Sequence, residues 1–461
     1  MNKSVINQPS NLNKKKLNWI DFKRLIELIS VDLKNYKLFE KNPEKFLVEF
    51  ALNLEPYSAK EAVDIYLKKK KAVDNPYIMQ AYKIIQPIYD DLFKRVDISN
   101  FTFLKFQKWI QRKKKALAWE SKEARKILSH FNAPVMFELN QGCSSQCDFC
   151  CLNTHPLTKI YPYTKENKKF WLEILKITKE EIGNAASVGA CYFATEPLDN
   201  FDYEKFIADF YQVFYTFPQT TTVKGATNIK RIKQLMNQLG LEELQKAKLR
   251  FSIVSQEQLK LIYQNYTKKE LAYVELLMNN KESIHPYSDS GRARNIHKKR
   301  GKKNFEAAPS VCLIGFLVNL CSKTISLITP RKPSNNYPLG MEIISSKKFL
   351  TPKEYRHIIR KTINIFMPFK INKNHKLRFH SGISIQSKGN IVTFLGENIK
   401  RSLSLSAESQ TVLKKLQKEV CLIKNIFKEK KYSNFLRKSI LNRLQHLYDL
   451  GFLEILEREE Y

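Results

Sequence analysis

Long apolar runs and paired cysteines are both scarce in this chain of 461 residues. The longest apolar run, VCLIGFLVNLC at residues 311–321, is shorter than the roughly 20 residues that a membrane-spanning helix needs. The first 16 residues lack the apolar core of a signal peptide. A chain of this length can bury a core without disulfide bonds, so its eight cysteines are not needed as a disulfide scaffold. We therefore expect a cytoplasmic protein with reduced thiols and no membrane partner.

Acidic residues are also few: the chain has 45 Asp and Glu but 79 Lys and Arg, which gives a formal net charge of +34. Such a charge attracts polyanions, including nucleic acid. The lysines are spread along the chain, with denser runs at residues 111–126 and 297–304. Because dispersed lysines usually mark solvated helix faces, the charge favours nucleic acid only weakly as a partner.

The spacing of apolar residues changes along the chain, and the pattern predicts an α/β fold. Residues 1–18 are polar and read as a disordered basic tail, and residues 19–130 place apolar residues at helical spacing. From Pro134 strands alternate with helices in four βα units, which predicts a parallel sheet with right-handed crossovers. The strands are expected at 134–140, 189–197, 219–227 and 248–255, and the helices at 164–188, 200–217, 228–240 and 256–280.

The rest of the chain predicts a hairpin and a terminal module. Residues 309–329 read as two strands joined by a tight turn at 321–323. Residues 389–406 read as paired short strands, and 407–427 and 433–450 as helices before Gly451. We expect a catalytic domain at 131–345, a connecting α/β segment at 346–390 and a winged-helix-like module at 391–461.

Cysteines gather at one place, after the first predicted strand. Cys143, Cys147 and Cys150 have the spacing C-x3-C-x2-C. Thiolates are the usual ligands of iron-sulfur clusters, and three of them leave one iron of a [4Fe-4S] cluster open to a small molecule. A closed zinc site is the alternative. It is disfavoured because Cys150 and Cys151 are adjacent and the chain has no second C-x2-C pair.

The pattern formed by Cys143, Cys147, Phe149 and Cys150 resembles the signature loop of the radical S-adenosylmethionine (SAM) superfamily. The resemblance implies a partial (β/α)6-type barrel and one [4Fe-4S] cluster, held by the three cysteines, whose open iron binds SAM. Residues 189–197 resemble the Gly-Gly-Glu-Pro segment of that superfamily, which contacts the SAM amino group. Ala194 and Thr195 replace the two glycines, and Glu196 and Pro197 are retained. The alternative for Glu196 is an exposed carboxylate that caps the next helix.

Further polar residues follow the predicted strands. Because α/β folds place their chemistry at the carboxyl ends of parallel strands, these residues are expected to face the SAM ribose and carboxylate. They are Thr222, Lys224, Ser252 and Ser255. Arg292 and Arg294 in SGRAR are expected to bind a carboxylate of SAM or carbonyls of a peptide, unless they form a solvated basic loop.

Segments between residues 134 and 342, among them LRFSIVS, SDSGRAR and NNYPLGMEI, resemble the proteusin-type radical SAM epimerases that mature ribosomally made peptides. The resemblance implies that a 5'-deoxyadenosyl radical removes the Cα hydrogen of an L-residue in a precursor peptide. A cysteine thiol then returns hydrogen to the opposite face, which gives the D-residue. It also implies an electron donor such as flavodoxin or ferredoxin. The terminal module is expected to bind the leader of the precursor as an added strand, although the same shape also binds DNA.

The thiol that returns hydrogen is predicted to be Cys312, with Cys321 as second choice. Strand alternation places Cys191 on the face opposite Glu196, and Cys151 is expected to point outward. Two rivals stay open. One is another radical SAM peptide modification, such as carbon–carbon or thioether crosslinking, and the other is a non-catalytic zinc protein that binds nucleic acid.

Overall fold

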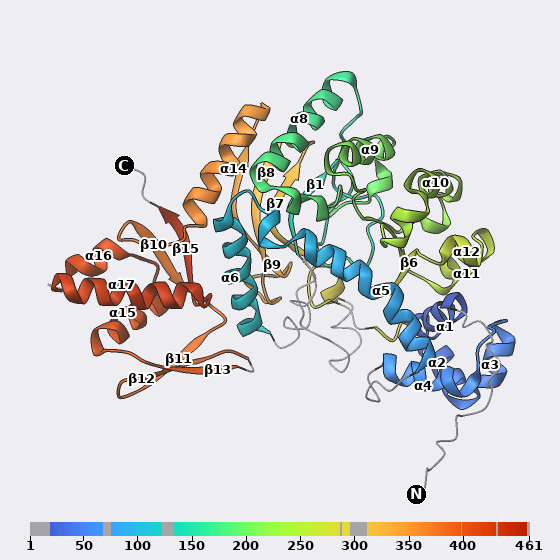
Figure 1. Cartoon of the computed structure of the whole chain (residues 1–461), viewed down its shortest axis with the longest axis horizontal. Coiled ribbons are helices and arrows are strands. Elements are labelled where there is room, and N and C mark those ends of the chain that lie inside the picture. Colours follow the sequence, from blue (N-terminus) through green and yellow to red (C-terminus); the bar gives the residue numbers. More distant parts are fainter. Residues whose placement is uncertain are drawn as a thin grey trace, which may run out of the picture.

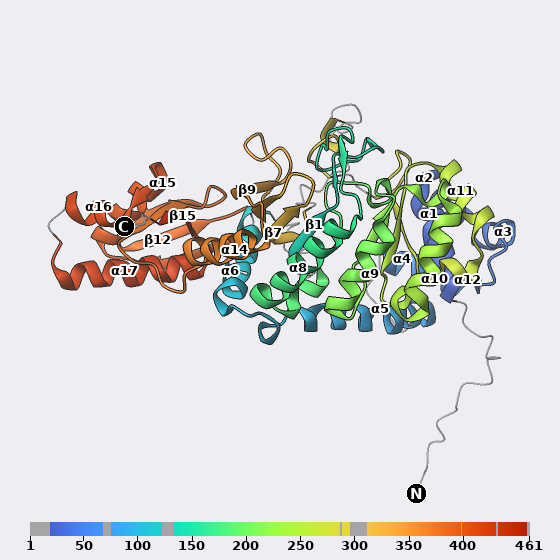
Figure 2. The ribbon, with the colours of Figure 1, turned by 90° about the horizontal axis from the view of Figure 1, so that it is seen from above.

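The computed structural model describes residues 19–67, 75–121, 132–285, 288–295, 311–397, 399–429 and 432–458. The predicted tail at 1–18 and the basic run at 297–304 lie outside these residues. The molecule has a helical end, a central body of sheets and helices, and a C-terminal unit at the opposite end (Figure 1). A view from above shows the three parts in a row (Figure 2). In the described ranges, no helix combines the length and apolar character needed to cross a bilayer.

The N-terminal helices do not pack as one body. The first four, together with Tyr77 of the fifth, build a small core around Phe22, Leu25 and Phe39. The sixth instead contributes Trp109 to the central core and Trp119 to the C-terminal core. The described part of the helical region predicted at 19–130 therefore reaches from the helical end to the junction with the C-terminal unit, which extends beyond it (Figure 1). Its helices are α1 (Trp19–Val31), α2 (Leu33–Lys41), α3 (Pro43–Glu49), α4 (Pro56–Tyr66), α5 (Pro76–Arg95) and α6 (Leu104–Glu120).

The central body contains two sheets that meet along one irregular segment. The first has the order β1-β7-β8-β9, in which β1 and β7 are parallel and the other pairs antiparallel. The second is parallel, with the order β4-β5-β6. These strands are β1 (Ala133–Glu138), β7 (Leu313–Asn319), β8 (Thr324–Pro330), β9 (Met341–Lys348), β4 (Thr220–Thr222), β5 (Leu249–Ile253) and β6 (Glu275–Met278). Among the described residues the two sheets do not close into one barrel, so the (β/α)6-type barrel stays a prediction.

Two of the predicted central elements differ from the structure. Residues 189–197 form no regular strand. They run beside β1 through the bond from Phe137 N to Ala190 O, and further along Ala194 N bonds the side chain of Glu138 in place of a neighbouring backbone. The helix predicted at 256–280 ends at Asn265, and β6 follows. The helices that cover the sheets are α8 (Lys165–Ile182), α9 (Tyr203–Phe214), α10 (Ile229–Gln245), α11 (Gln256–Asn265) and α12 (Lys268–Leu271).

The C-terminal unit, residues 371–458, combines a three-stranded sheet, a three-stranded meander and three helices. Its sheet has the order β14-β10-β15, so the unit includes a strand that precedes the boundary expected at 391. The helix predicted at 407–427 is interrupted by β14, and Gly451, with φ of +84°, follows the last helix as expected. The elements from 352 onward are α14 (Pro352–Phe366), β10 (His375–Phe379), β11 (Ser384–Lys388), β12 (Ile391–Leu395), β13 (Lys400–Ser404), α15 (Ala407–Lys418), β14 (Cys421–Leu422), α16 (Ile423–Glu429), α17 (Asn434–Asp449) and β15 (Leu453–Arg458).

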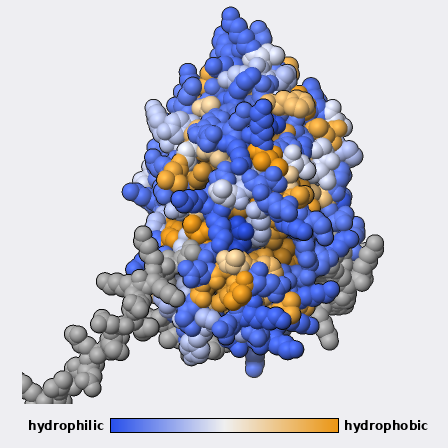
Figure 3. Space-filling model, turned by 90° about the vertical axis from the view of Figure 1, so that its right-hand side faces the viewer, coloured by the Kyte–Doolittle hydropathy of each residue, from blue (hydrophilic) through white to orange (hydrophobic). Residues whose placement is uncertain are grey.

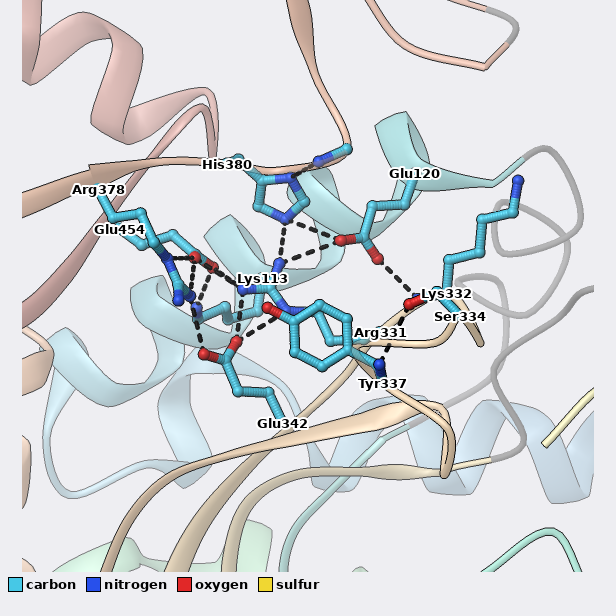
Figure 4. Close-up of polar contacts among 11 residues, drawn as sticks. Lys113, Glu120, Arg331, Lys332, Ser334, Tyr337, Glu342, Arg378, His380 and Glu454 are labelled. Carbon is cyan, nitrogen blue, oxygen red and sulfur yellow. Dashed lines mark hydrogen bonds and ion pairs between the residues drawn. The ribbon is translucent and has the colours of Figure 1, made fainter. Parts of the chain in front are cut away.

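A buried group of charges joins the C-terminal unit to the central body, and we call it the Arg331 cluster (Figure 4). Arg331 follows β8 and is 2% exposed. Its guanidinium donates to Glu120 of α6 at 3.1 Å, to Glu342 of β9 at 2.8 Å and to Glu454 of β15 at 2.7 Å. His380, just after β10, lies against the same guanidinium. Three parts of the chain that are far apart in sequence thus meet at one side chain.

Two more cations complete the Arg331 cluster. Lys113 donates to Glu454 at 2.7 Å, and Arg378 bonds both Glu454 and Glu342. Burial alone raises the pKa of Glu454, but Lys113 and the arginines hold that pKa well below its usual range. Burial, together with the nearby guanidinium, lowers the pKa of His380 to about 3, so its ring is neutral at physiological pH. The junction is therefore an interlocked set of carboxylates and cations.

The surface of the helical end is mainly hydrophilic, with apolar side chains interspersed among polar ones (Figure 3). Exposed apolar residues of α2, α3 and α10 include Leu38, Val48 and Leu241. Isolated apolar side chains are usual on protein surfaces, and we assign no partner to them.

Candidate active site

The loop that carries the clustered cysteines, residues 142–158, is closed at its base by two short strands. β2 (Asn140–Gln141) pairs antiparallel with β3 (Lys159–Ile160), and Cys143 N donates to His155 O at 3.0 Å. Gly142 has φ of +85°, and a Cβ at this position would lie 2.1 Å from Pro156 O. Only glycine fits here without strain. This cysteine loop comes after β1, as the sequence predicts, with Leu139 and β2 between them.

The three predicted ligands, Cys143, Cys147 and Cys150, are half-buried and line one cavity of about 470 Å3, which we call the cysteine cavity. Phe149 lines it as well. So does Cys151, although the sequence suggested that this thiol points outward. The outward direction of this thiol stays a prediction, because the loop has no strand or helix period from which the direction of a side chain can be inferred.

The opposite wall of the cysteine cavity comes from the irregular segment after α8 and from the carboxyl ends of the parallel strands. The lining residues there are Tyr192, Phe193, Ala194, Thr195, Glu196, Thr221, Val223, Ser252, Leu277, Met278 and Asn279. His285, Ser288 and Arg292 also line the cavity, and Arg292 bonds carbonyl oxygens of the cysteine loop. The predicted residues Ala194, Thr195, Glu196, Ser252 and Arg292 therefore share a cavity with the cysteines. Pro197, Thr222, Lys224, Ser255 and Arg294 do not line it.

Glu196 is held rigidly at the cavity edge. Its side chain is buried and accepts bonds from Leu198 N at 3.1 Å, from the Thr222 hydroxyl at 2.6 Å and from Val223 N at 3.0 Å. Burial raises the pKa of this carboxyl, against the effect of these donors. The residue does cap the short helix that begins at Pro197, but it is buried and not the exposed cap of the alternative interpretation. Thr222 contributes through Glu196 and does not reach the cavity.

Two other predicted residues have structural contacts. Lys224 Nζ donates to Asp199 Oδ1 at 2.6 Å, and Asp199 in turn accepts from Ser144 N at 2.8 Å, so this lysine supports the cysteine loop from behind. Ser255 caps α11 by accepting from Gln258 N. Neither contact points into the cysteine cavity.

The two arginines of SGRAR differ from each other. Arg292 lines the cavity, and its guanidinium bonds carbonyl oxygens of the cysteine loop. Arg294 reaches away, to Ser334 O at 3.3 Å and toward Asp289. A carboxylate of SAM, the ligand expected for Arg292, would therefore compete for this guanidinium with the carbonyl oxygens of the cysteine loop.

Neither predicted hydrogen-donor thiol lines the cysteine cavity. Cys312 is exposed and precedes β7, at the strand end opposite the cysteine loop, where its carbonyl accepts from Ala133 N. Cys321 is buried at the turn after β7, and its thiol donates to Leu139 O at 3.5 Å. Cys191 is buried in the central core and does not line the cavity either, although the strand whose alternation predicted its direction is not formed.

Besides several lining residues such as Tyr192 and Thr221, sequence reasoning missed Glu138, which shapes the cavity from outside its lining. Glu138, the last residue of β1, accepts from Ala194 N at 3.0 Å and from Asn319 Nδ2 at 2.9 Å. Burial raises the pKa of this carboxyl. The signal in the sequence was an acidic residue at the end of an apolar strand, where an unpaired charge is costly to bury. Glu138 fixes the segment that carries Ala194 and Thr195.

The side chains that line the cavity are of the chemical type that binds an iron-sulfur cluster. Three thiols line one wall, and on the facing wall the Thr195 hydroxyl is buried without a hydrogen-bond partner among the described residues. Within the same residues, no three His, Cys, Asp or Glu side chains gather closely enough for a single metal ion. A cluster binds each thiolate to a different iron, so its ligands need a wider spacing than those of one ion.

Comparisons with known proteins leave the family open. No family model matches the chain. The uncharacterized protein y4wI of Sinorhizobium fredii (strain NBRC 101917 / NGR234) is 33% identical over 268 residues, which cover 54% of this chain and 51% of that protein. The chain thus spans about half the length of the curated relative it matches. The crystal structure of BtrN in complex with AdoMet and 2-DOIA aligns with 33% of this chain and 57% of that one, with a TM-score of 0.24 and 12% identity. A likeness this small carries no argument about function.

Proposed function

We propose that this chain is a radical SAM enzyme that epimerises residues of a ribosomal precursor peptide. One observation carries the first part of the proposal. The thiols of Cys143, Cys147 and Cys150 line the same cavity as the buried Glu196, at the carboxyl ends of parallel strands. When bound, a [4Fe-4S] cluster and SAM supply a 5'-deoxyadenosyl radical able to remove a hydrogen atom from carbon.

The residues of the chain act by binding and orientation. Glu196, fixed by three donors, presents its carboxylate at the cavity edge for the amino group of SAM. Thr195 offers an unpaired hydroxyl on the same wall. The Ala194 amide is already bonded to Glu138, so this position offers a ligand its carbonyl oxygen. A cavity of about 470 Å3 is within the range of roughly 300–1,000 Å3 usual for small-molecule sites.

The peptide substrate and the epimerisation rest on the sequence resemblance. Inversion needs a thiol that returns hydrogen to the substrate carbon. Cys312 and Cys321 stay the predicted donors, although neither lines the cysteine cavity, whereas Cys151 does. Replacing each of the three by alanine in turn identifies the donor, because that variant forms 5'-deoxyadenosine without yielding D-residues.

The C-terminal unit is proposed to bind the leader of the precursor as an added strand. β11 is an edge strand of its sheet among the described residues. A groove of about 200 Å3 lies beside it, lined by Ile385, Val392 and Leu413 together with Gln410 and Lys414. An exposed strand edge next to a partly apolar groove is the surface that strand addition uses.

The experiment for the core proposal is anaerobic reconstitution with iron and sulfide, followed by reduction with dithionite in the presence of SAM. We expect 5'-deoxyadenosine from the wild type and none from a variant with Cys143, Cys147 and Cys150 changed to alanine. A wild-type protein with a full iron complement that does not cleave SAM would refute the assignment. Flavodoxin or ferredoxin can then replace dithionite as the proposed physiological electron donor.

A further inference from the structure

The segment 290–294 packs on the backbone of the cysteine loop. Arg292 N donates to Cys150 O at 2.8 Å, and Ala293 N reaches the same oxygen at 3.3 Å. Gly291, with φ of +56°, approaches so closely that an added Cβ would lie 2.4 Å from the carbonyl carbon and oxygen of Cys151. Backbone contact this close requires glycine at position 291.

The side chain of Arg292 extends the contact along the loop. Its Nε donates to Cys147 O at 3.0 Å, and its Nη1 donates to Thr154 O at 2.7 Å and to Gln146 Oε1 at 2.9 Å. Gln146 passes the contact on, because its Nε2 donates to Cys143 O at 2.7 Å. Backbone carbonyls of all three predicted ligands are therefore bonded, directly or through one residue, to Arg292.

The loop has a reason to need this support. Gln146 has φ of +44°, a left-handed conformation that costs a residue with a Cβ roughly 1 kcal/mol or more. Such a conformation persists when surrounding contacts hold it. The contacts come from a segment that is itself fixed, since Gly291 N donates to Pro338 O at 2.9 Å and Pro338 belongs to the β8–β9 connection that starts at Arg331.

We propose that Arg292 is a positioning residue for the metal cluster, which holds the cysteine loop in its cluster-binding conformation and leaves SAM and substrate to other residues. The inference rests on the proposed function. The planar guanidinium serves three acceptors in one orientation, which the single ammonium of lysine cannot reproduce. Hydrogen bonds to residues around a metal ligand typically contribute 10–100-fold in metal affinity.

The test compares Arg292→Ala and Arg292→Lys with Arg294→Ala, a matched control in the same segment that bonds Ser334 and not the cysteine loop. Each protein is reconstituted anaerobically. Iron per chain, the rate of cluster loss to a chelator and the electron paramagnetic resonance spectrum of the reduced cluster are then measured. We expect loss about tenfold faster or more in Arg292→Ala, an intermediate rate in Arg292→Lys and wild-type behaviour in the control.

Two outcomes would overturn the inference. The first is wild-type cluster retention and spectrum in Arg292→Ala with a raised KM for SAM, which would make Arg292 a SAM-binding residue. The second is cluster loss of equal size in the Arg294→Ala control. Gln146→Ala tests the same bonds if Arg292→Ala does not fold, and it is expected to lose the cluster faster as well. A wild-type protein that binds no cluster refutes the proposed function itself, so the two failures are distinct.

Discussion

Replacing Arg331 by methionine is expected to lower the free energy of unfolding by about 3–5 kcal/mol, the cost typical of removing one partner from a buried ion pair. The guanidinium bonds Glu120, Glu342 and Glu454 in a site where it is 2% exposed. Glu342 and Glu454 keep Arg378 after the change. The uncompensated charge therefore falls mainly on Glu120.

Because the unpaired charge lies mainly on Glu120, a second change at that residue is expected to restore part of the lost free energy of unfolding. Changing Glu120 to glutamine in the Arg331→Met background removes the charge that lost its partner, and this second change is expected to restore about 1–3 kcal/mol. Lys332→Met is the control, because Lys332 pairs with Glu397 at the surface, where an ion pair contributes roughly 0–1 kcal/mol.

The assay is urea unfolding followed by tryptophan fluorescence. Trp109 reports on the central core and Trp119 on the C-terminal core, and both lie on α6. We expect both regions to lose stability in Arg331→Met, since the cluster joins them. A change below about 1 kcal/mol, or one no larger than that of the Lys332→Met control, would show that the cluster does not stabilise the junction.

Four further outcomes are expected. The pKa of His380 is about 3 in the folded chain and 6.5 ordinarily, so between these values only the unfolded chain binds the proton. The free energy of unfolding is therefore expected to fall as the pH drops from 6.5 toward 3. His380→Asn should make this fall smaller when unfolding is measured at a series of pH values. Glu138→Gln should weaken the bond from Ala194 N and raise KM for SAM several-fold with little change in iron content. A loss of iron as large as the rise in KM would contradict a role of Glu138 in placing the SAM-binding segment. Gly142→Ala places a Cβ 2.1 Å from Pro156 O and should reduce bound iron after reconstitution; full iron would show that the loop adapts. In heavy water, the enzyme should yield D-residues that carry solvent deuterium at Cα, whereas a product with hydrogen lost between two residues would indicate crosslinking.

Local patterns predicted those parts of the fold that local forces determine. Helices α8, α9 and α10 follow from apolar periodicity, and β1 followed by the cysteine loop follows from an apolar run and thiol spacing. β6 was missed because its four residues sit inside a longer stretch with helical spacing. The break is set by Thr267 and Glu270, which form a capping box and start a new short helix.

The candidate site could be predicted only in part, because contacts between distant residues determine its geometry. The sequence predicts that Cys143, Cys147, Cys150 and Glu196 belong to one site, and in the structure all four line one cavity. The contacts of Arg292 depend on a segment about 145 residues away, and no local pattern records them. Directions within irregular backbone, as at Cys151, likewise follow from tertiary packing.

The bond between Arg292 and Cys147 joins residues 145 positions apart, with most of the central body between them. During translation, the thiols therefore emerge from the ribosome long before the residues that pack on their loop. A nascent chain at that stage presents open, oxidisable cysteines with the loop unsupported. Stable metal loading in the cell should therefore follow the synthesis of residues 290–294, whose contacts hold the loop.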